Sequence, residues 1–330
     1  MPMPHISPPT VRGLVRDAAT APSMHNAQPW RFVYHRNAGV LDLRSDAARD
    51  MTYADPDNRA QYLGCGAALL NLRVAAAHNG LVMHTSLLPD ADDPRLVARI
   101  RPGTAGTAAA TGALASLYPA LSRRHTSRLP FEDHPLPDEL KQLLAREAEA
   151  EGARLLFPGG WHVRFLLDLI AEAETYAEHA GDPDEARWLR GATAPEAADD
   201  GVPWSAVGPA SEDTAWHTRD FGRGAGRDRS AARFERRPQL AVLSTADDDP
   251  PRWVVAGQAL ERVLLAATTV HVATGLTTQP LERQSLRWLL RDPVRGGGAV
   301  QMLLRLGYGQ GSTGAVTRRR PVDDILDLEP

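Results

Sequence analysis

Hydrophobic and polar positions follow two patterns along the chain, one typical of strands and one typical of helices. Short apolar or alternating stretches bounded by turn residues predict strands, and apolar residues at helical spacing over longer stretches predict helices. The predicted strands are 30–35, 39–45, 81–89, 96–102, 153–158, 239–245, 276–281 and 301–308. The predicted helices are 11–20, 59–80, 137–152, 161–179 and 253–275.

Two of the predicted helices resemble each other. The helices at 59–80 and 253–275 each contain an early glycine and end in Gly-Leu before a strand. Buried helices can look alike because most of their residues are apolar. The repeated order of strands and helices nevertheless favours two copies of one unit, diverged and fused. The Gly/Ala/Thr run at 103–112 is the expected connector, which divides the chain into 1–112 and 113–330.

The composition limits the class of protein and of site. The chain has 330 residues, 43% of them hydrophobic, and a net charge of −4, so neither nucleic acid nor an anionic membrane is an expected partner. Cys65 is the only cysteine, which excludes an internal disulfide and a cysteine zinc site. The histidines show no metal-ligand spacing. The first residues lack a signal-peptide core, and charges interrupt the apolar stretches before they could span a membrane, so we expect a cytoplasmic protein.

The first candidate for chemistry is the stretch 22-PSMHNAQPW-30. It places the amide side chains of Asn26 and Gln28 in a loop between Pro22 and Pro29. Proline restricts the backbone, so the loop loses less entropy when it binds a ligand. Amides at fixed positions suit the recognition of a polar ring edge.

The second candidate is the stretch 123-RRHTSRLPF-131. Arg124, Thr126 and Arg128 alternate, and in an extended segment all three side chains lie on one side. Two guanidinium groups and a hydroxyl can bind a phosphate or an anionic ring edge. Taken alone, such a basic run is more typical of a solvated face.

Together, these two stretches resemble the FMN-dependent nitroreductase family. Two further segments fit the same family: 275-GLTTQPL-281, and 306-LGYGQ-310 followed by 318-RRRPVDDIL-326. The resemblance covers most of the chain. Ordinary family members are homodimers in which the Arg segment of one subunit and the Asn-Gln loop of the other complete each flavin site. Here each motif occurs once, which resembles the Acg-type subgroup of fused pseudo-dimers.

The resemblance implies a fold and a set of binding residues. The fold would be α+β, with two fused pseudo-symmetric halves whose mixed sheets are flanked by helices. One FMN would lie between the halves of a monomer that acts as an internal pseudo-dimer, with a further oligomer left open. Backbone N–H groups near 279–282 would face flavin N5. The implied cofactor-binding residues are Pro22, Ser23, Asn26, Gln28, Arg124, His125, Thr126, Arg128, Gln279, Pro280, Leu281, Arg318 and Arg319.

The resemblance also assigns roles within this set. Arg124 and Thr126 would bind the phosphate and ribityl chain, together with Arg318 or Arg319, and Arg128 would lie near the pyrimidine edge. A fixed cation there favours the anionic reduced flavin. No side chain is expected to be catalytic, because the cofactor carries the chemistry.

The implied activity is the NAD(P)H-dependent reduction of nitroaromatics or quinones through FMN. The alternative is a non-catalytic FMN-binding or flavin-sequestering protein. The irregular region at about 190–238 is expected to form a lid, with Trp204 as a plug over the flavin. We interpret Cys65 as a small core residue. The glycine runs at 64–69 and 222–229 lack the strand-to-helix setting and glycine pattern of a dinucleotide site.

Overall fold

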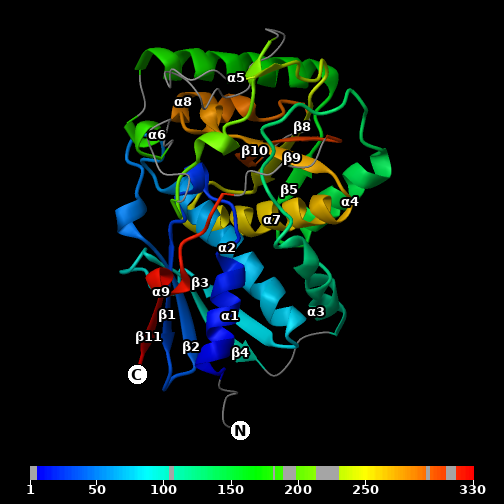
Figure 1. The fold of residues 1–330 in the computed structure, drawn as a ribbon. Helices are drawn as coiled ribbons and strands as arrows, with labels where there is room; N and C mark the ends of the chain where they lie inside the picture. The colour runs from blue at the N-terminus through cyan, green and yellow to red at the C-terminus, as the bar shows by residue number, and fades with distance from the viewer. Residues whose placement is uncertain are drawn as a thin grey trace.

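Two β-sheets lie on opposite sides of a pair of long helices (Figure 1). We describe them from a computed structural model, which describes residues 6–103, 108–180, 183–188, 198–212, 230–294, 298–309 and 317–330. The two helices are α2 (Arg59–His78) and α7 (Pro250–Thr269), and most of their residues are buried. The core therefore follows this helix pair and extends to the inner face of each sheet.

The first sheet has five strands in the order β11-β1-β2-β4-β3. The last strand of the described chain, β11, runs parallel to β1, and the other neighbours are antiparallel. The sheet is therefore mixed, as predicted. Its strands are β1 (Trp30–His35), β2 (Val40–Ser45), β3 (Val82–Leu87), β4 (Leu96–Gly103) and β11 (Leu326–Glu329).

The second sheet has four strands in the order β5-β8-β10-β9, all antiparallel to their neighbours. In the first unit α2 follows β2 and leads to β3 and β4. In the second unit α7 follows β8 and leads to β9 and β10. The two units thus share one topology, β1-β2-β4-β3 and β5-β8-β10-β9. The strands of the second unit are β5 (Arg154–Leu156), β8 (Gln239–Thr245), β9 (Ala273–Thr277) and β10 (Ala299–Gly307).

The long helices touch through glycines. A Cβ atom added at Gly66 would lie 2.2 Å from the Val254 carbonyl oxygen, and one added at Gly257 would lie 2.1 Å from the Leu63 carbonyl oxygen. No real Cβ makes such contacts, so only glycine allows the two backbones to approach this closely. These are the glycines that the two similar helices share in the sequence.

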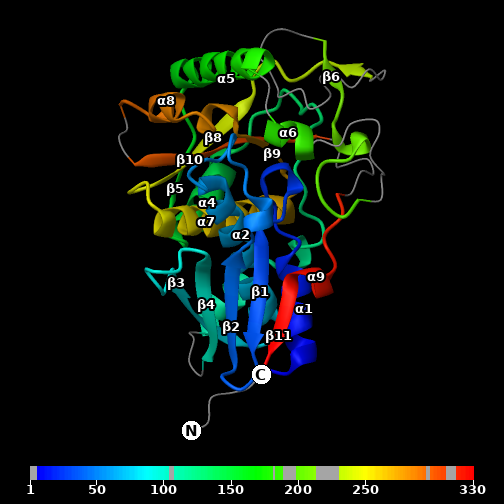
Figure 2. The same cartoon turned by 90° about the vertical axis from the view of Figure 1, so that its left-hand side faces the viewer.

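The remaining elements cover the sheets and connect them. Helix α1 begins at Pro8, and its N-cap Ser7 accepts a hydrogen bond from the Thr10 N–H, which is a favoured helix start. Figure 2 shows α5 beyond the second sheet, at the far end from β11. The other helices are α1 (Pro8–Ala18), α3 (Ala108–Ala115), α4 (Asp138–Glu149), α5 (Gly160–Ala180), α6 (Pro183–Trp188), α8 (Gln284–Arg287) and α9 (Val322–Ile325). Strands β6 (Ala210–Ser211) and β7 (Ala231–Ala232) form a short parallel pair.

The fold confirms the α+β class and corrects several element boundaries. The helix predicted at 253–275 ends at Thr269, because His271 adopts a left-handed φ of 59° and β9 starts at Ala273. The segment 276–281 divides between the end of β9 and a 3₁₀ turn, Gln279–Leu281. In the predicted connector 103–112, residues 108–112 are helical, and residues 104–107 lie outside the described ranges. The second sheet is antiparallel rather than mixed, apart from one parallel bridge between Thr126 and Thr274.

The division of the chain at 112 and 113 stays a prediction. The sequence did not reveal that β11 would return to the first sheet, across that division. No helix in the described ranges is long and apolar enough to span a membrane.

Candidate functional site

The loop between Pro22 and Pro29 has an unusual backbone. His25, Asn26 and Gln28 have φ angles of 49°, 57° and 54°, in the left-handed region that residues other than glycine rarely adopt. Each such residue costs on the order of 1–3 kcal/mol, so the surrounding structure must hold it in place. Ser23 helps to do so, because its Oγ accepts a hydrogen bond of 2.9 Å from the Gln28 N–H. Left-handed residues of this kind concentrate at ligand sites.

Gln28 supports the loop from beneath. It is fully buried, its Nε2 donates to the Asp199 carbonyl at 2.7 Å, and its Oε1 accepts from the Arg320 N–H at 2.8 Å. Both ends of this amide therefore have protein partners. Of the predicted binding residues, Gln28 is thus placed to hold the loop in shape.

Asn26 lies on the side of the loop that faces a cavity. Its Nδ2 donates to the carbonyls of Gly201 and Arg318, at 3.0 and 3.1 Å. Its Oδ1 is buried and accepts no hydrogen bond from the described residues. An acceptor thus remains for a ligand that donates a hydrogen bond.

The segment 124–128 lies along the edge of β9. Thr126 forms a parallel bridge with Thr274, and the Ser127 N–H donates to the Thr274 carbonyl at 2.7 Å. A Cβ at Gly275 would lie 3.1 Å from the Ser127 carbonyl oxygen, so the absent side chain allows this close approach. The segment thereby reaches the loop from the other half of the chain.

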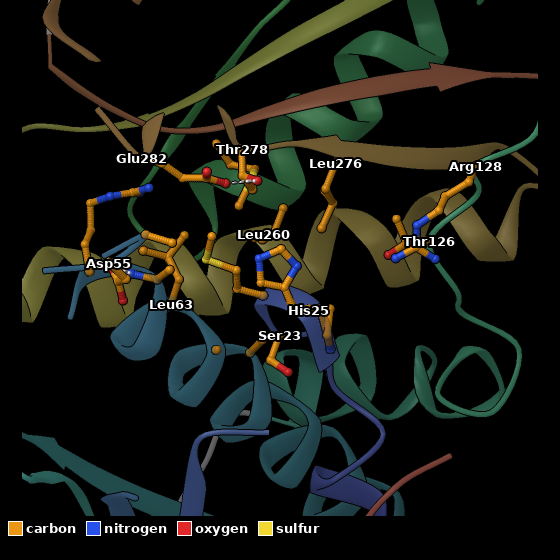
Figure 3. Close-up of a pocket in the computed structure, with 18 of the residues that line it drawn as sticks. Ser23, His25, Asp55, Leu63, Thr126, Arg128, Leu260, Leu276, Thr278 and Glu282 are labelled. Carbon is orange, nitrogen blue, oxygen red and sulfur yellow. Dashed lines mark hydrogen bonds between the residues drawn. The ribbon is translucent and has the colours of Figure 1, made fainter. Parts of the chain in front are cut away.

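Two connected cavities open where the loop and this segment meet. The apolar cavity, of about 120 Å³, lies between α2, α7 and the second sheet, as Figure 3 shows. The arginine cavity, of about 330 Å³, follows the segment 121–129. Both belong to one site, because five residues line both: Pro22, Ser23, Thr126, Ser127 and Arg128.

The walls of the apolar cavity come from several elements. Helix α2 contributes Leu63, Gly64 and Ala67, and helix α7 contributes Leu260. In Figure 3 the His25 ring lies between these walls, with Thr126 and Arg128 on one side and Asp55 on the other. The cavity is therefore a largely apolar space with polar groups at its ends, as is typical of small-molecule sites.

The arginine cavity contains two guanidinium groups, that of buried Arg124 and that of half-buried Arg319. Arg124 Nη2 and Arg319 Nη2 both donate to the Thr20 carbonyl, each at 3.2 Å. Burial and the nearby charge of Arg124 lower the pKa of Arg319 to about 9. Arg124 Nη1 and Arg319 Nε are buried and donate no hydrogen bond to the described residues. Two like charges held together with unused donors form a site for an anion.

The side chains of Arg318 and Arg319, which were predicted together, lie in different places. The Arg319 side chain joins Arg124, whereas the Arg318 side chain is exposed and only its carbonyl contacts the loop, through Asn26. Of the two predicted arginines, Arg319 thus lines the arginine cavity and Arg318 does not.

The other residues predicted from the Arg segment line the arginine cavity. His125 is exposed, and its Nδ1 lies 3.1 Å from the Arg123 carbonyl. Arg128 Nη1 donates to the Ala206 carbonyl at 3.1 Å. Thr126 and Arg128 also border the apolar cavity, so they lie where the two cavities join.

The turn at Gln279, Pro280 and Leu281 is placed differently from the prediction. The N–H groups of Leu281 and Glu282 donate to the Thr278 carbonyl within the turn. Contrary to the expectation, these two N–H groups therefore do not point into the cavity. Gln279 Nε2 donates to buried Glu174 at 2.8 Å. The residues of this region that line the apolar cavity are Leu276, Thr278 and Glu282.

The predicted lid is described only in part, because 189–197 and 213–229 lie outside the described ranges. Within 198–212, Ser205, Ala206 and Gly208 line the arginine cavity. Trp204 is half-buried and lines neither cavity among the described residues, so the expected indole over the apolar cavity is not found. The segment 199–208 therefore borders the arginine side of the site.

Several lining residues were not predicted. Arg59, Leu63 and Leu260 lie on long helices that are buried on nearly all sides, so hydrophobic spacing gives no sign of which face lines a cavity. Glu261, which contacts Arg124, was not predicted either. Its position in the sequence is unusual, because it is an acidic residue within an apolar helix. No group of side chains suited to a metal ion occurs among the described residues.

Comparison with known proteins identifies the family. The chain is 29% identical to "Putative NAD(P)H nitroreductase acg" of Mycobacterium tuberculosis, over 99% of this chain and 98% of that protein. It is 30% identical to "Putative NAD(P)H nitroreductase Rv3131" of the same organism, over 96% of this chain and 91% of that protein. A crystal structure named as a putative nitroreductase from Anabaena variabilis overlaps 92% of this chain and 88% of its own, with a TM-score of 0.48 and 11% identity. No protein-family model matches the chain. On its likeness to these two mycobacterial proteins across almost the whole of each sequence, the chain belongs to the Acg-type nitroreductase family.

Proposed function

We propose that this chain binds one FMN and catalyses the NAD(P)H-dependent reduction of nitroaromatics or quinones. The observation that carries the proposal is the pair of neighbouring guanidinium groups, those of Arg124 and Arg319, next to an apolar cavity. The family names of the two mycobacterial relatives support the choice of NAD(P)H as electron donor.

The arginine cavity fits the phosphate of FMN. Arg124 and Arg319 would repel each other without an anion, and each retains a buried N–H that has no acceptor among the described residues. A phosphate oxygen accepts charge-assisted hydrogen bonds from such groups. Thr126 and His125, which line the same cavity, can add contacts to the phosphate or the ribityl chain.

The apolar cavity fits the flavin ring. Its walls are largely aliphatic, with Leu63, Leu260 and Met302 among them. Burial of the ring against such walls is favourable because it removes apolar surface from water. The Asn26 Oδ1, which accepts no hydrogen bond from the described residues, can accept one from the bound cofactor.

When bound, FMN would supply hydride transfer from the nicotinamide donor to the acceptor. The chain's own residues would bind and orient it. Arg128, where the two cavities join, would place a positive charge beside the ring. The aliphatic walls would exclude water from one side of the ring, and no side chain has to act as a nucleophile.

The donor and acceptor have an entrance beside the apolar cavity. A groove lined by Tyr53, Tyr176, Gln279 and Arg283 shares Ala54 and Glu282 with that cavity. The Arg283 guanidinium stacks on the Tyr176 ring, and its other face can contact a planar substrate. We propose this groove as the route for planar electron donors and acceptors.

The decisive experiment combines a spectrum with a turnover assay. The purified chain, reconstituted with FMN, should show an oxidised flavin spectrum with one FMN per chain. It should then consume NADH or NADPH in steady state with a nitroaromatic acceptor. Absence of bound flavin, or two flavins per chain, would contradict the proposal of one site between two unequal halves.

A second function is favoured by the segment 199–208. This segment borders the arginine cavity and is held by Asn26, Gln28 and Arg128. If it stays closed, the chain would bind FMN without turning over. Stoichiometric FMN with no NAD(P)H consumption above that of free FMN would support flavin sequestration in place of catalysis.

A further inference from the structure

Glu261 lies behind the arginine cavity in the middle of α7. It is fully buried, and its Oε1 is 3.3 Å from Arg124 Nε. Neither carboxylate oxygen has a hydrogen-bond donor in good geometry among the described residues. A buried carboxylate with so few partners is costly unless a nearby charge compensates it.

The surroundings of Glu261 supply a surplus of positive charge. Arg124 comes from the segment after α3, and Arg319 comes from the segment before α9. Helix α2 contributes the neutral side chain of Asn71. Among the described residues, the groups that shift this carboxyl are therefore two cations and one neutral amide, so the cluster carries one net positive charge when Glu261 is ionised.

The protonation of this carboxyl is finely balanced. Burial raises the pKa of Glu261 to about 7, and Arg124, Asn71 and Arg319 oppose the rise. A further negative charge brought close to a carboxylate raises its pKa, because like charges disfavour ionisation. The arrival of an anion on the two arginines would therefore shift this balance.

We propose that Glu261 is the resident counter-anion of Arg124 and Arg319, and that it takes up a proton from solvent when a phosphate group binds to these arginines. In the ligand-free protein the carboxylate holds the two guanidinium groups together. When phosphate supplies the negative charge instead, Glu261 becomes a neutral acid. Glu261 is thus a positioning residue for the anion site, and phosphate binding is coupled to proton uptake. The choice of FMN as ligand rests on the proposed function, whereas the coupling itself requires only a phosphate.

The test is calorimetric titration of FMN into the cofactor-free full chain at pH 8, in two buffers of different ionisation enthalpy. At this pH the FMN phosphate is already a dianion, because its second pKa is about 6. Glu261 is mostly ionised, so we expect an uptake approaching one proton per FMN. Riboflavin, which lacks the phosphate, should bind with almost no proton uptake.

The variant Glu261→Gln keeps the shape of the side chain and removes its charge. It should bind FMN about 10-fold more tightly at pH 8, because one like charge near the phosphate is gone. Its proton uptake should fall to a small remainder. Asp42→Asn is the matched control, since Asp42 is also buried and paired with an arginine, Arg99 at 2.8 Å, on strands β2 and β4 of the first sheet, and neither residue lines the two cavities. This control should change neither the FMN affinity nor the proton uptake.

The outcomes separate this inference from the proposed function. FMN binding to the wild-type chain without proton uptake would overturn the inference and leave the flavin site intact, even if the Gln variant does not fold. Binding of neither flavin would refute the proposed function. Glycerol 3-phosphate, a phosphate monoester that is also a dianion at pH 8, would then serve as the probe: proton uptake on its binding supports the inference, and binding without uptake, or no binding, overturns it.

Discussion

Gly66 and Gly257 have reciprocal positions at the crossing of α2 and α7. Gly66 faces the carbonyl of Val254, three residues before Gly257, and Gly257 faces the carbonyl of Leu63, three residues before Gly66. Each helix therefore makes the same contact with the other. This reciprocity is the relation expected between two copies of one unit that pack about a two-fold axis, and it supports the inference of a fused pseudo-dimer.

Replacing either glycine should disturb both halves of the protein. In Gly66→Ala or Gly257→Ala the new methyl group would meet a backbone carbonyl, which cannot move aside without shifting the helix. We expect each variant to lower the free energy of unfolding by about 2 kcal/mol or more. Equilibrium denaturation in urea measures this change.

The matched control for these variants is Gly160→Ala. Gly160 begins α5, has no atom within 4 Å of an added Cβ, and does not have a positive φ. We expect this substitution to change stability by less than about 0.5 kcal/mol. Equal effects at the three positions would show that the helix crossing does not depend on the glycines.

Arg319 and its neighbour Arg318 should differ in their contribution to FMN affinity. Arg319→Ala removes a cation from the arginine cavity and should weaken FMN binding about 10- to 100-fold, which corresponds to the loss of a charged hydrogen bond. Riboflavin binding should change little, because the lost partner is the phosphate. Fluorescence titration of both flavins measures the two affinities. Arg318→Ala is the control and should leave both affinities unchanged. If Arg319→Ala weakens riboflavin binding as much as FMN binding, Arg319 does not bind the phosphate.

The stability of the cofactor-free protein should depend on pH through Glu261. The folded-state pKa of this carboxyl is raised from 4.5 to about 7. Its contribution is fully present below pH 4.5 and is lost as the pH rises towards 7, because the unfolded chain releases its proton first. We expect the free energy of unfolding of Glu261→Gln to fall less between pH 5 and 7 than that of the wild type. Parallel pH profiles from guanidinium denaturation would contradict this expectation.

The segment 199–208 should control a second access to the bound flavin, because it contacts Arg128, where the two cavities join. Gly208 has a φ of 84°, and a Cβ there would lie 2.8 Å from the Arg128 carbonyl oxygen. Gly208→Ala should therefore displace the segment while leaving Arg124 and Arg319 in place. We expect FMN stoichiometry to be retained and a small chemical reductant to bleach the flavin several-fold faster, as measured by stopped flow.

Gly159→Ala is the control for this experiment, because an added Cβ there has no neighbour within 4 Å. Its bleaching rate should match that of the wild type. A slower or unchanged rate in Gly208→Ala, with FMN still bound, would indicate that the segment contributes to substrate binding or only to structure.

The site could be predicted from the sequence where its chemistry is local. Arg124, Thr126 and Arg128 lie in one alternating segment, and Asn26 lies in one proline-bounded loop, so short motifs identified them. The structure brings these residues around one pair of cavities. Their contacts with FMN remain a proposal, which the binding experiments above address.

The sequence could not predict features that depend on distant contacts. Whether Arg318 or Arg319 joins the cavity depends on how 317–320 lies against Thr20, far away in the chain. The role of Gln28 depends on its partners Asp199 and Arg320. The apolar run after Thr269 continued the helical pattern, and only pairing of β9 with β10 shows that it becomes a strand. Local patterns carry no information on such partners.

The return of β11 to the first sheet sets the order of events during protein synthesis. The loop at 22–29 leaves the ribosome well before Arg319, Arg320 and β11, which are translated after all the strands of the second sheet. Gln28 cannot receive its hydrogen bond from Arg320, nor Arg124 its companion Arg319, until β11 has paired with β1. A nascent chain that does not yet extend past β11 therefore lacks a complete phosphate site, and FMN would be bound only after this strand has been made.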